Sequence, residues 1–418
     1  MRFATPATFA LLFVLWPGIC RAQRPDDTGP PQTIEEVRKV ARVHVGPFYL
    51  TPGVNIKEVG VDTNVFNDGE KAKSDFTATA SPLANMWLPV ARRALFHAFA
   101  ASDLVWYTRF ASERSVDPQV SGDGSFFVHR LTVTGGYAYL NTRQRPNYEL
   151  DLRSRRLERT GTLGVKYAMT PKFSVAVSGR HSILEYDADA VFEGTQLHDT
   201  MNRRTTGGAV ELRQRLTPLT SIGLRAEAFG DRFPFAPERN ADSVRVMPGV
   251  EFQPRALLKG SAYVGYRSFR AKNPALLPDF SGLVSDVTLG YTLKGSMAFK
   301  IHHARDVEYS FQPTQPYFVD TTIGLALRRA LGSKYDAVAS VDRHAYAYRD
   351  LRASGLGPST GKVSRLDIVW ISEASVGYRV GRTARLAFGV MYIQREAPDA
   401  SAHNYDGLRI RATMASGF

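Results

Sequence analysis

The chain has 418 residues with 53 Lys or Arg against 40 Asp or Glu, which gives a formal net charge of +13. After residue 22 no apolar run is long enough for a membrane-spanning helix, which excludes a helical membrane protein. An excess of basic residues can support nucleic-acid binding. Because the first 22 residues, described next, indicate export, we expect instead anionic solutes, lipopolysaccharide or acidic polysaccharide as partners, and no nucleic acid.

Residues 1–22 have the layout of a signal peptide that directs export. Arg2 precedes an apolar run over 9–16, and Ala22 provides a small residue at the expected cleavage site. Cys20, the single cysteine, lies inside this segment, so the mature chain is expected to contain no disulfide. Loss of Arg2 and Arg21 would lower the net charge to +11.

Residues 23–45 form a separate N-terminal segment, expected in the periplasm. QRPDDTGPPQ reads as a polar tether, and TIEEVRKVA then carries Thr33 and Glu36 at the spacing of a capping box. The pattern predicts a short helix. It could plug the lower mouth of the following domain or simply lead into its first strand.

From residue 46 to 418 the sequence repeats a period of two. Leu386, Phe388, Val390 and Tyr392 alternate with Arg385, Ala387, Gly389 and Met391, and several other stretches alternate in the same way. Successive side chains of a strand point to opposite faces, so each strand has one apolar face. The opposite face carries mostly Gly, Ser, Thr and Arg, which suits a water-filled lumen.

The connections between these stretches alternate between short turns, such as MTPKFS (169–174), and long polar loops, such as DADAVFEGTQLHDT (187–200). This alternation predicts an all-β fold, a single transmembrane antiparallel up-and-down barrel with both termini on the periplasmic side. About 18 strands are expected, and the number falls to 16 if VTGG (133–136) is not a turn. The expected strands are 47–60, 75–89, 93–110, 122–133, 136–146, 155–169, 172–187, 201–216, 219–233, 241–254, 257–271, 281–294, 296–311, 317–331, 334–349, 363–380, 383–396 and 404–418.

The densest charge cluster is RQRPNYELDLRSRRLER, at 143–159. As an outer loop it could fold inward, where Arg153 and Arg155 would narrow the pore with fixed positive charge, as arginine rings do in anion-selective pores. Alternatively, the loop stays solvated and pairs its own charges.

Eight further arginines fall on the predicted lumen face and are candidates for anion binding, because guanidinium stays charged and binds carboxylate or phosphate in a fork. They are Arg213, Arg215, Arg225, Arg267, Arg379, Arg385, Arg409 and Arg411. The last two are expected low on the final strand, away from the constriction. In the alternative reading, Glu211, Glu227 and Glu373 pair with these arginines and stabilise the wall.

A catalytic or metal site is not expected. His302 and His303 in IHHARD are adjacent on a strand and therefore face opposite sides, which suits neither one metal nor one catalytic dyad. The sequence has no Gly-rich phosphate loop, CxxC pair or HExxH motif. We therefore expect no enzyme activity and no cofactor.

Two short motifs resemble outer-membrane barrels of Gram-negative bacteria. The final strand resembles theirs in Leu408, Ile410, Met414 and the terminal Phe418, the signal that the barrel assembly machinery reads, although Ser416 departs from it. The stretch from Asp62 to Phe66, DTNVF, resembles the Asp-Ser/Thr-Asn-Val/Ile-Phe motif of the proteins named putative β-barrel porins.

This resemblance implies a porin-like channel of the outer membrane for passive diffusion of small hydrophilic solutes, and the arginines suggest that these are anions. The second hypothesis is a barrel that takes part in export or anchoring of surface polysaccharide, and the third is an outer-membrane hydrolase. Outer-membrane lipid and lipopolysaccharide are expected partners, and the sequence leaves a homo-oligomer open.

Overall fold

The computed structural model describes residues 34–91, 93–254, 256–274, 277–351, 363–381, 384–398 and 403–416. The expected signal peptide (1–22), the polar tether and Phe418 lie outside the described residues. Within these ranges, no helix is long and apolar enough to cross a membrane.

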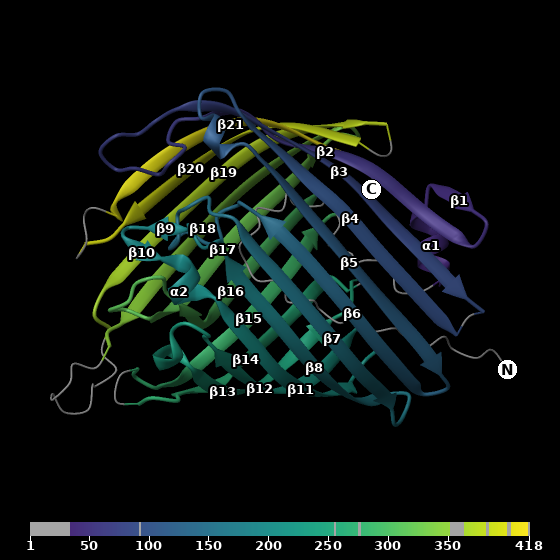
Figure 1. Cartoon of the computed structure of the whole chain (residues 1–418). Coiled ribbons are helices and arrows are strands. Elements are labelled where there is room, and N and C mark those ends of the chain that lie inside the picture. The colour runs from purple at the N-terminus through teal and green to yellow at the C-terminus, as the bar shows by residue number, and fades with distance from the viewer. Residues whose placement is uncertain are drawn as a thin grey trace.

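Eighteen long strands of the described chain form one closed antiparallel barrel (Figure 1). They are β2 (Phe48–Asp62), β3 (Asp75–Val90), β4 (Ala94–Tyr107), β5 (Ser115–Val128), β6 (Leu131–Thr142), β7 (Arg156–Ala168), β8 (Phe173–Tyr186), β11 (Arg203–Arg215), β12 (Thr220–Arg232), β13 (Ala241–Phe252), β14 (Leu258–Ala271), β15 (Phe280–Leu293), β16 (Met297–Tyr309), β17 (Tyr317–Leu331), β18 (Tyr335–Arg349), β19 (Leu366–Val380), β20 (Ala384–Glu396) and β21 (Tyr405–Ser416). Each strand pairs with the next, and β2 pairs with β21 to close the ring. The predicted fold class and the count of 18 are confirmed.

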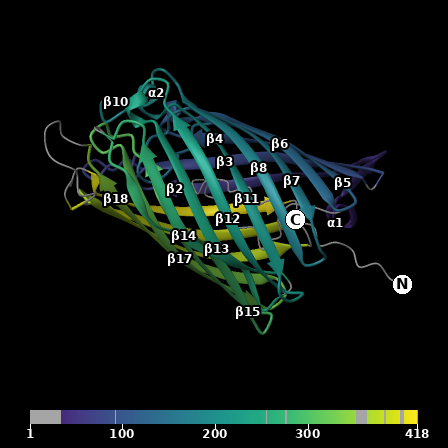
Figure 2. The ribbon, with the colours of Figure 1, turned by 90° about the horizontal axis from the view of Figure 1, so that it is seen from below.

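The remaining elements are short and lie at the two ends (Figures 1 and 2). Helix α1 (Ile34–Val40) and strand β1 (Val43–Val45), which pairs with β2, lie at one end. The hairpin of β9 (Val191–Phe192) and β10 (Thr195–Gln196) and helix α2 (Leu197–Met201) lie at the other. Two 3-10 turns, Ala111–Glu113 and Pro237–Arg239, belong to loops at this second end.

Loop length separates the two ends of the barrel. The connections at the α1 end are two to five residues long, and those at the α2 end are seven to sixteen. We call these the short-turn end and the long-loop end. Transmembrane barrels of the bacterial outer membrane have this asymmetry, with the short turns in the periplasm.

One predicted turn is wrong. VTGG (133–136) lies inside β6, and the chain turns instead at 129–130, where His129 adopts a left-handed φ of 53°. The two adjacent glycines suggested a turn, but the structure gives a different reason for a glycine at position 136. A Cβ there would lie 3.1 Å from Thr162 Oγ1 on the neighbouring strand. A glycine inside a strand often marks such a close approach. Strand β5 correspondingly begins at Ser115 rather than 122.

The two faces of the wall differ as the alternation predicts. On β14, Val264 is 50% exposed on the outside while Tyr263 is fully buried on the inside. The same alternation holds on β12, where Ile222 is exposed and Ser221 is buried. The exposed apolar band is the surface that a membrane barrel presents to lipid.

The inner face departs from the prediction in the long-loop half. It carries apolar side chains on β17 to β20, among them Val369, Ile371, Met391 and Ile393, all less than 7% exposed. Their strands are apolar on both faces, as in the run LDIVWI at 366–371. This local loss of alternation is the sequence signal for inner-wall residues that pack against protein instead of water.

Helix α1 packs on the inner wall at the short-turn end. Val37 is fully buried against Trp87 of β3 and Leu95 of β4, with Tyr49 and Phe127 beside them. The predicted helix is present, and it covers part of the barrel mouth in addition to leading into the first strand.

The seam between β2 and β21 gives a test of closure. A Cβ at Gly60 would lie 1.8 Å from the carbonyl oxygen of Ile410, so Gly60→Ala must separate the two strands. We expect this variant to lose most of the fast-migrating folded band that closed barrels give on an unheated denaturing gel. Gly161→Ala is the matched control, because a Cβ at Gly161 meets nothing within 4 Å. Equal folded fractions for both variants would contradict the seam geometry.

Candidate functional site

The loop between β6 and β7, residues 143–155, crosses the barrel interior, and we call it the inner loop. The carbonyl oxygen of Tyr148 accepts a hydrogen bond of 3.0 Å from Arg395 of β20. The ring of Tyr148 lies 5.3 Å from that of His344 of β18. Strands β7 and β18 are half a barrel apart in the strand order. The loop therefore folds inward, as one of the two sequence hypotheses expects.

Polar contacts fix the ends of the inner loop to its own side of the barrel. Gln144 Nε2 donates to Asp103 Oδ2 at 2.6 Å, and Arg143 Nη1 donates to the Ser112 carbonyl at 2.6 Å. Asn67 of the 63–74 loop donates to Asp151 at 2.6 Å. Both ends are thus held while the middle reaches across.

Apolar packing holds the middle. Leu150, 1% exposed, belongs to a cluster with Leu197 and Met201 of α2 and Phe311 of the 310–316 loop. Arg239, from the 233–240 loop, donates to the carbonyl oxygens of Ser310 and Gln312 at 2.6 and 2.8 Å. Loops from four places on the circumference therefore meet inside the long-loop end of the barrel.

Glu149 is a buried carboxyl group at the centre of this contact. Ser310 Oγ donates to its Oε1 at 2.8 Å, and its Oε2 has no hydrogen-bond partner among the described residues. Burial raises the pKa of Glu149 to about 7, against the opposing effects of Ser310, Arg395 and Arg365. The carboxyl group is therefore protonated in mildly acidic solution.

This protonation predicts how the seating of the inner loop depends on pH. In a detached loop Glu149 would ionise near its usual pKa of 4.5, whereas the seated group keeps its proton until about pH 7. The free energy that holds the loop should therefore fall by up to about 3 kcal/mol as pH rises from 4.5 to 7. Hydrogen-exchange protection of residues 143–155 measures this change.

Glu149→Gln mimics the protonated carboxyl and should make loop protection independent of pH in this range. Glu158→Gln is the control, since the Glu158 side chain is 38% exposed on β7. If loop protection in Glu149→Gln still depends on pH, the dependence arises from another titratable group.

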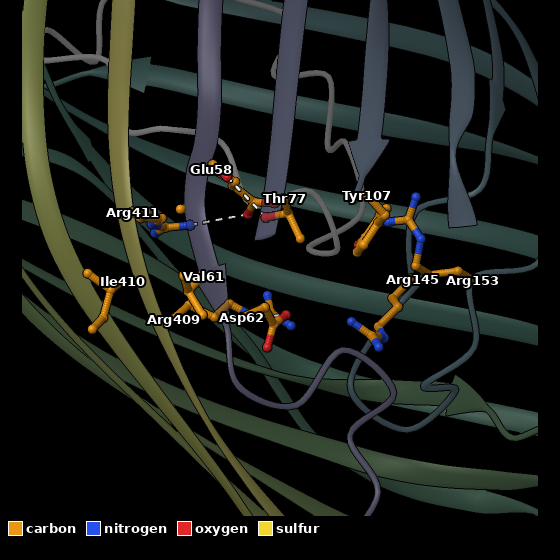
Figure 3. Close-up of a pocket in the computed structure, with 11 residues that line it drawn as sticks. Glu58, Val61, Asp62, Thr77, Tyr107, Arg145, Arg153, Arg409, Ile410 and Arg411 are labelled. Carbon is orange, nitrogen blue, oxygen red and sulfur yellow. Dashed lines mark hydrogen bonds and ion pairs between the residues drawn. The ribbon is translucent and has the colours of Figure 1, made fainter. Parts of the chain in front are cut away.

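Beside the inner loop lies a cavity with four guanidinium groups, the arginine cavity (Figure 3). It is lined by Glu58, Gly60, Val61, Asp62, Thr77, Tyr107, Arg145, Arg153, Arg409, Ile410 and Arg411. Arg409 and Arg411 come from β21, while Arg145 and Arg153 come from the inner loop. A bulge in β2, where Glu58 has a φ of 55°, places Glu58 and Gly60 opposite β21.

All four guanidinium groups are also ion-paired. Arg409 Nε lies 2.9 Å from Asp62 Oδ2, and Arg411 bridges Glu58 at 3.2 Å and Glu373 at 2.8 Å. Arg153 Nε lies 3.4 Å from Glu113, and Arg145 pairs with Asp151. Of these five carboxylates, Glu58 and Asp62 line the cavity together with the four guanidinium groups. The other three, Glu113, Asp151 and Glu373, are not among the lining residues. The lining is positive, but the neighbouring carboxylates weaken its field.

The predicted position of Arg409 and Arg411 is wrong. Strand β21 starts at Tyr405 at the long-loop end, so Arg409 lies in its upper half and Arg411 near its middle, and both share the arginine cavity with Arg153. Arg155 is not among the lining residues, and its Nη1 donates to Asn141 Oδ1 at 2.7 Å.

The other candidate arginines lie on the inner face, mostly in cross-strand ion pairs. The closest contacts join Arg213 to Glu251 (2.5 Å), Arg225 to Glu251 (3.4 Å) and Glu211 (3.6 Å), Arg267 to Asp306 (2.5 Å), and Arg385 and Arg379 to Asp336 (2.5 and 4.0 Å). Arg215 is exposed at the short-turn end of β11. Glu227, expected as a partner of these residues, pairs with Arg245 instead. A role in anion passage stays a prediction for all of them.

Sequence reasoning did not single out Arg145, Tyr107 or Glu58 as site residues. Arg145 belongs to the same charge cluster as Arg153, which was a usable signal. Glu58 was not predictable, because the bulge that aims it inward leaves no pattern in a single strand.

The histidines of IHHARD are not clustered. His302 Nε2 lies 3.3 Å from Asp342 Oδ1, and a ring nitrogen of His303 lies 2.9 Å from the carbonyl oxygen of Thr322. Across the described ranges, no group of three His, Cys, Asp or Glu side chains is placed to hold a metal.

Solved structures of similar shape are bacterial outer-membrane proteins. A BenF-like porin from Pseudomonas fluorescens Pf-5 has a TM-score of 0.49 and 11% identity, over 88% of this chain and 97% of that one. The outer membrane protein OpdK from Pseudomonas aeruginosa has a TM-score of 0.40 and 8% identity, over 88% and 98%. The siderophore receptor PirA, also from Pseudomonas aeruginosa, has a TM-score of 0.43 and 8% identity, over 88% and 79%.

Among curated proteins, none matches this sequence. The family model described as "Putative beta-barrel porin 2" matches residues 41–417, a range that begins directly after α1 and contains all eighteen barrel strands. The closed barrel, the separation of short turns from long loops and this match agree, and the chain belongs to that family of outer-membrane barrels.

Proposed function

We propose that this outer-membrane barrel is a channel for the passive diffusion of small hydrophilic anions, with no catalytic step. Membership of a porin family supports the channel. The arginine cavity carries the proposal for anions, since four guanidinium groups from two distant parts of the chain converge on one space inside the barrel. We place the short-turn end in the periplasm, in line with other outer-membrane barrels.

The ion pairs of the cavity suit transport better than tight binding. A guanidinium group offers carboxylate or phosphate a planar fork of donors. Here each fork already shares its charge with a protein carboxylate, so a passing anion gains only part of the full attraction. A channel site must bind strongly enough to admit a solute and weakly enough to release it. We therefore expect a mild preference for anions.

The test is the reversal potential of purified protein in a planar bilayer under a potassium chloride gradient. Wild type should pass chloride more readily than potassium. Arg153→Gln and Arg409→Gln each remove one cavity charge and should move the reversal potential toward cation preference. The shift should be larger at low salt, where fixed charges are less screened.

Arg155→Gln is the matched control, because it removes the same charge from the same loop outside the cavity lining. It should move the reversal potential much less than Arg153→Gln. Equal shifts from Arg153→Gln and Arg155→Gln would place selectivity outside the arginine cavity.

A second candidate function is favoured by one observation. Four loops meet inside the long-loop end, three through the apolar cluster around Leu150 and the fourth through hydrogen bonds of Arg239, which would suit a plugged barrel with a role in export or anchoring of surface polysaccharide. Conductance separates the two functions. A folded wild-type protein that gives no current in the bilayer would favour this second candidate over the channel.

A further inference from the structure

The two ends of the barrel differ in charge as well as in loop length. The eight short turns are residues 91–93, 129–130, 169–172, 216–219, 253–257, 294–296, 332–334 and 381–383. In sequence they contain eight Lys or Arg and no Asp or Glu. The connections at the long-loop end contain 13 Lys or Arg and 13 Asp or Glu. Positive charge is therefore unbalanced at the short-turn end alone.

Five of these basic residues lie in the described structure, each in a different turn, and we call them the basic rim. They are Arg93, Arg130, Lys172, Lys294 and Lys334, and all five are exposed. No ion pair joins any of them to an acidic side chain within the described ranges. Arg130 Nη1 donates to the carbonyl oxygen of Met169 at 3.1 Å, which holds its guanidinium group between two neighbouring turns.

Directly beside the basic rim, the outer wall is apolar. The outward side chains next to the turns, or at the first position of a turn in the case of Met169, are large and 39–55% exposed, namely Val90, Val128, Met169, Leu293 and Leu331. Four tyrosines also face outward near these turns, namely Tyr167, Tyr291, Tyr335 and Tyr378. Outward tyrosines next to an apolar band mark the depth of lipid headgroups in membrane proteins. The band thus extends to the turns, and the basic rim begins where it ends.

We propose that the basic rim binds the anionic headgroups of phospholipids in the membrane leaflet at the short-turn end. Two observations favour lipid over a soluble acidic partner. The charges are distributed around the circumference, as a surrounding leaflet requires, and they adjoin the lipid-facing band. Lys and Arg at such a boundary extend their charged groups to the headgroup level while their alkyl stems stay on apolar surface.

The experiment measures which lipids line the reconstituted barrel. Purified full-length protein is placed in phosphatidylcholine bilayers with a trace of spin-labelled phosphatidylglycerol or spin-labelled phosphatidylcholine. The motionally restricted part of the spectrum gives the relative association of each lipid with the protein. A lipid that contacts one basic side chain should be favoured about fivefold over phosphatidylcholine. High salt should reduce this preference by screening.

The rim variant replaces all five basic-rim residues by Gln, and its selectivity should fall toward that for phosphatidylcholine. The matched control replaces five exposed basic residues of the long-loop end by Gln, namely Lys71, Lys73, Arg109, Arg270 and Lys272. This control loses the same charge and should keep most of the preference. Gel mobility before and after heating verifies that both variants are folded.

Two results would overturn the proposal: equal association of the two lipids with wild type, or a preference that the rim variant retains. A change in channel conductance of the rim variant with unchanged lipid preference would also overturn it, by assigning the rim to solute passage. The measurement needs no open pore, so its outcome is independent of the proposed anion channel.

Discussion

Closure of the hydrogen-bonded ring is the constraint on which the rest of the structure depends. In hydrocarbon, backbone donors and acceptors find no water, so a strand edge exposed to lipid would carry unpaired polar groups along its length. The pairing of β2 with β21 removes both edges at once. This pairing requires a bulge at Glu58 and a residue without a side chain at Gly60, so the seam leaves no room for a side chain at that position.

A closed ring of this size encloses more space than wall side chains alone fill, and the two halves of the lumen are filled differently. Charged residues of the wall pair across strands, as where fully buried Asp336 meets Arg328 and Arg385. A buried carboxylate is tolerated only when such partners replace its hydration. The long-loop half also has such ion pairs, for example Arg395 with Asp367, but there apolar wall residues pack in addition against loops that fold in. The arginine cavity lies where these two kinds of packing meet.

The sequence predicted the strands of the wall better than the loops and contacts inside the barrel. Alternation at a period of two assigned the faces correctly, and 16 of the 18 strand ranges lie within three residues of the observed ends. The glycines at 135–136 misled because a turn and a close strand contact use the same residue. Arg409 and Arg411 were misplaced along the barrel axis, although their face was predicted correctly. Contacts such as Tyr148 with Arg395 join residues nearly 250 positions apart, and no local pattern encodes them.

The reach of the inner loop sets an order for assembly. It leaves the wall in the first half of the chain, yet its partners on β18 and β20 belong to the last quarter. Its seat therefore does not exist until the late strands have joined the ring. Until then Glu149 faces water and is ionised at neutral pH. Before the loop is seated, the interior at the long-loop end lacks this filling, and seating the loop carries Glu149 from water to a buried place that favours its protonated form.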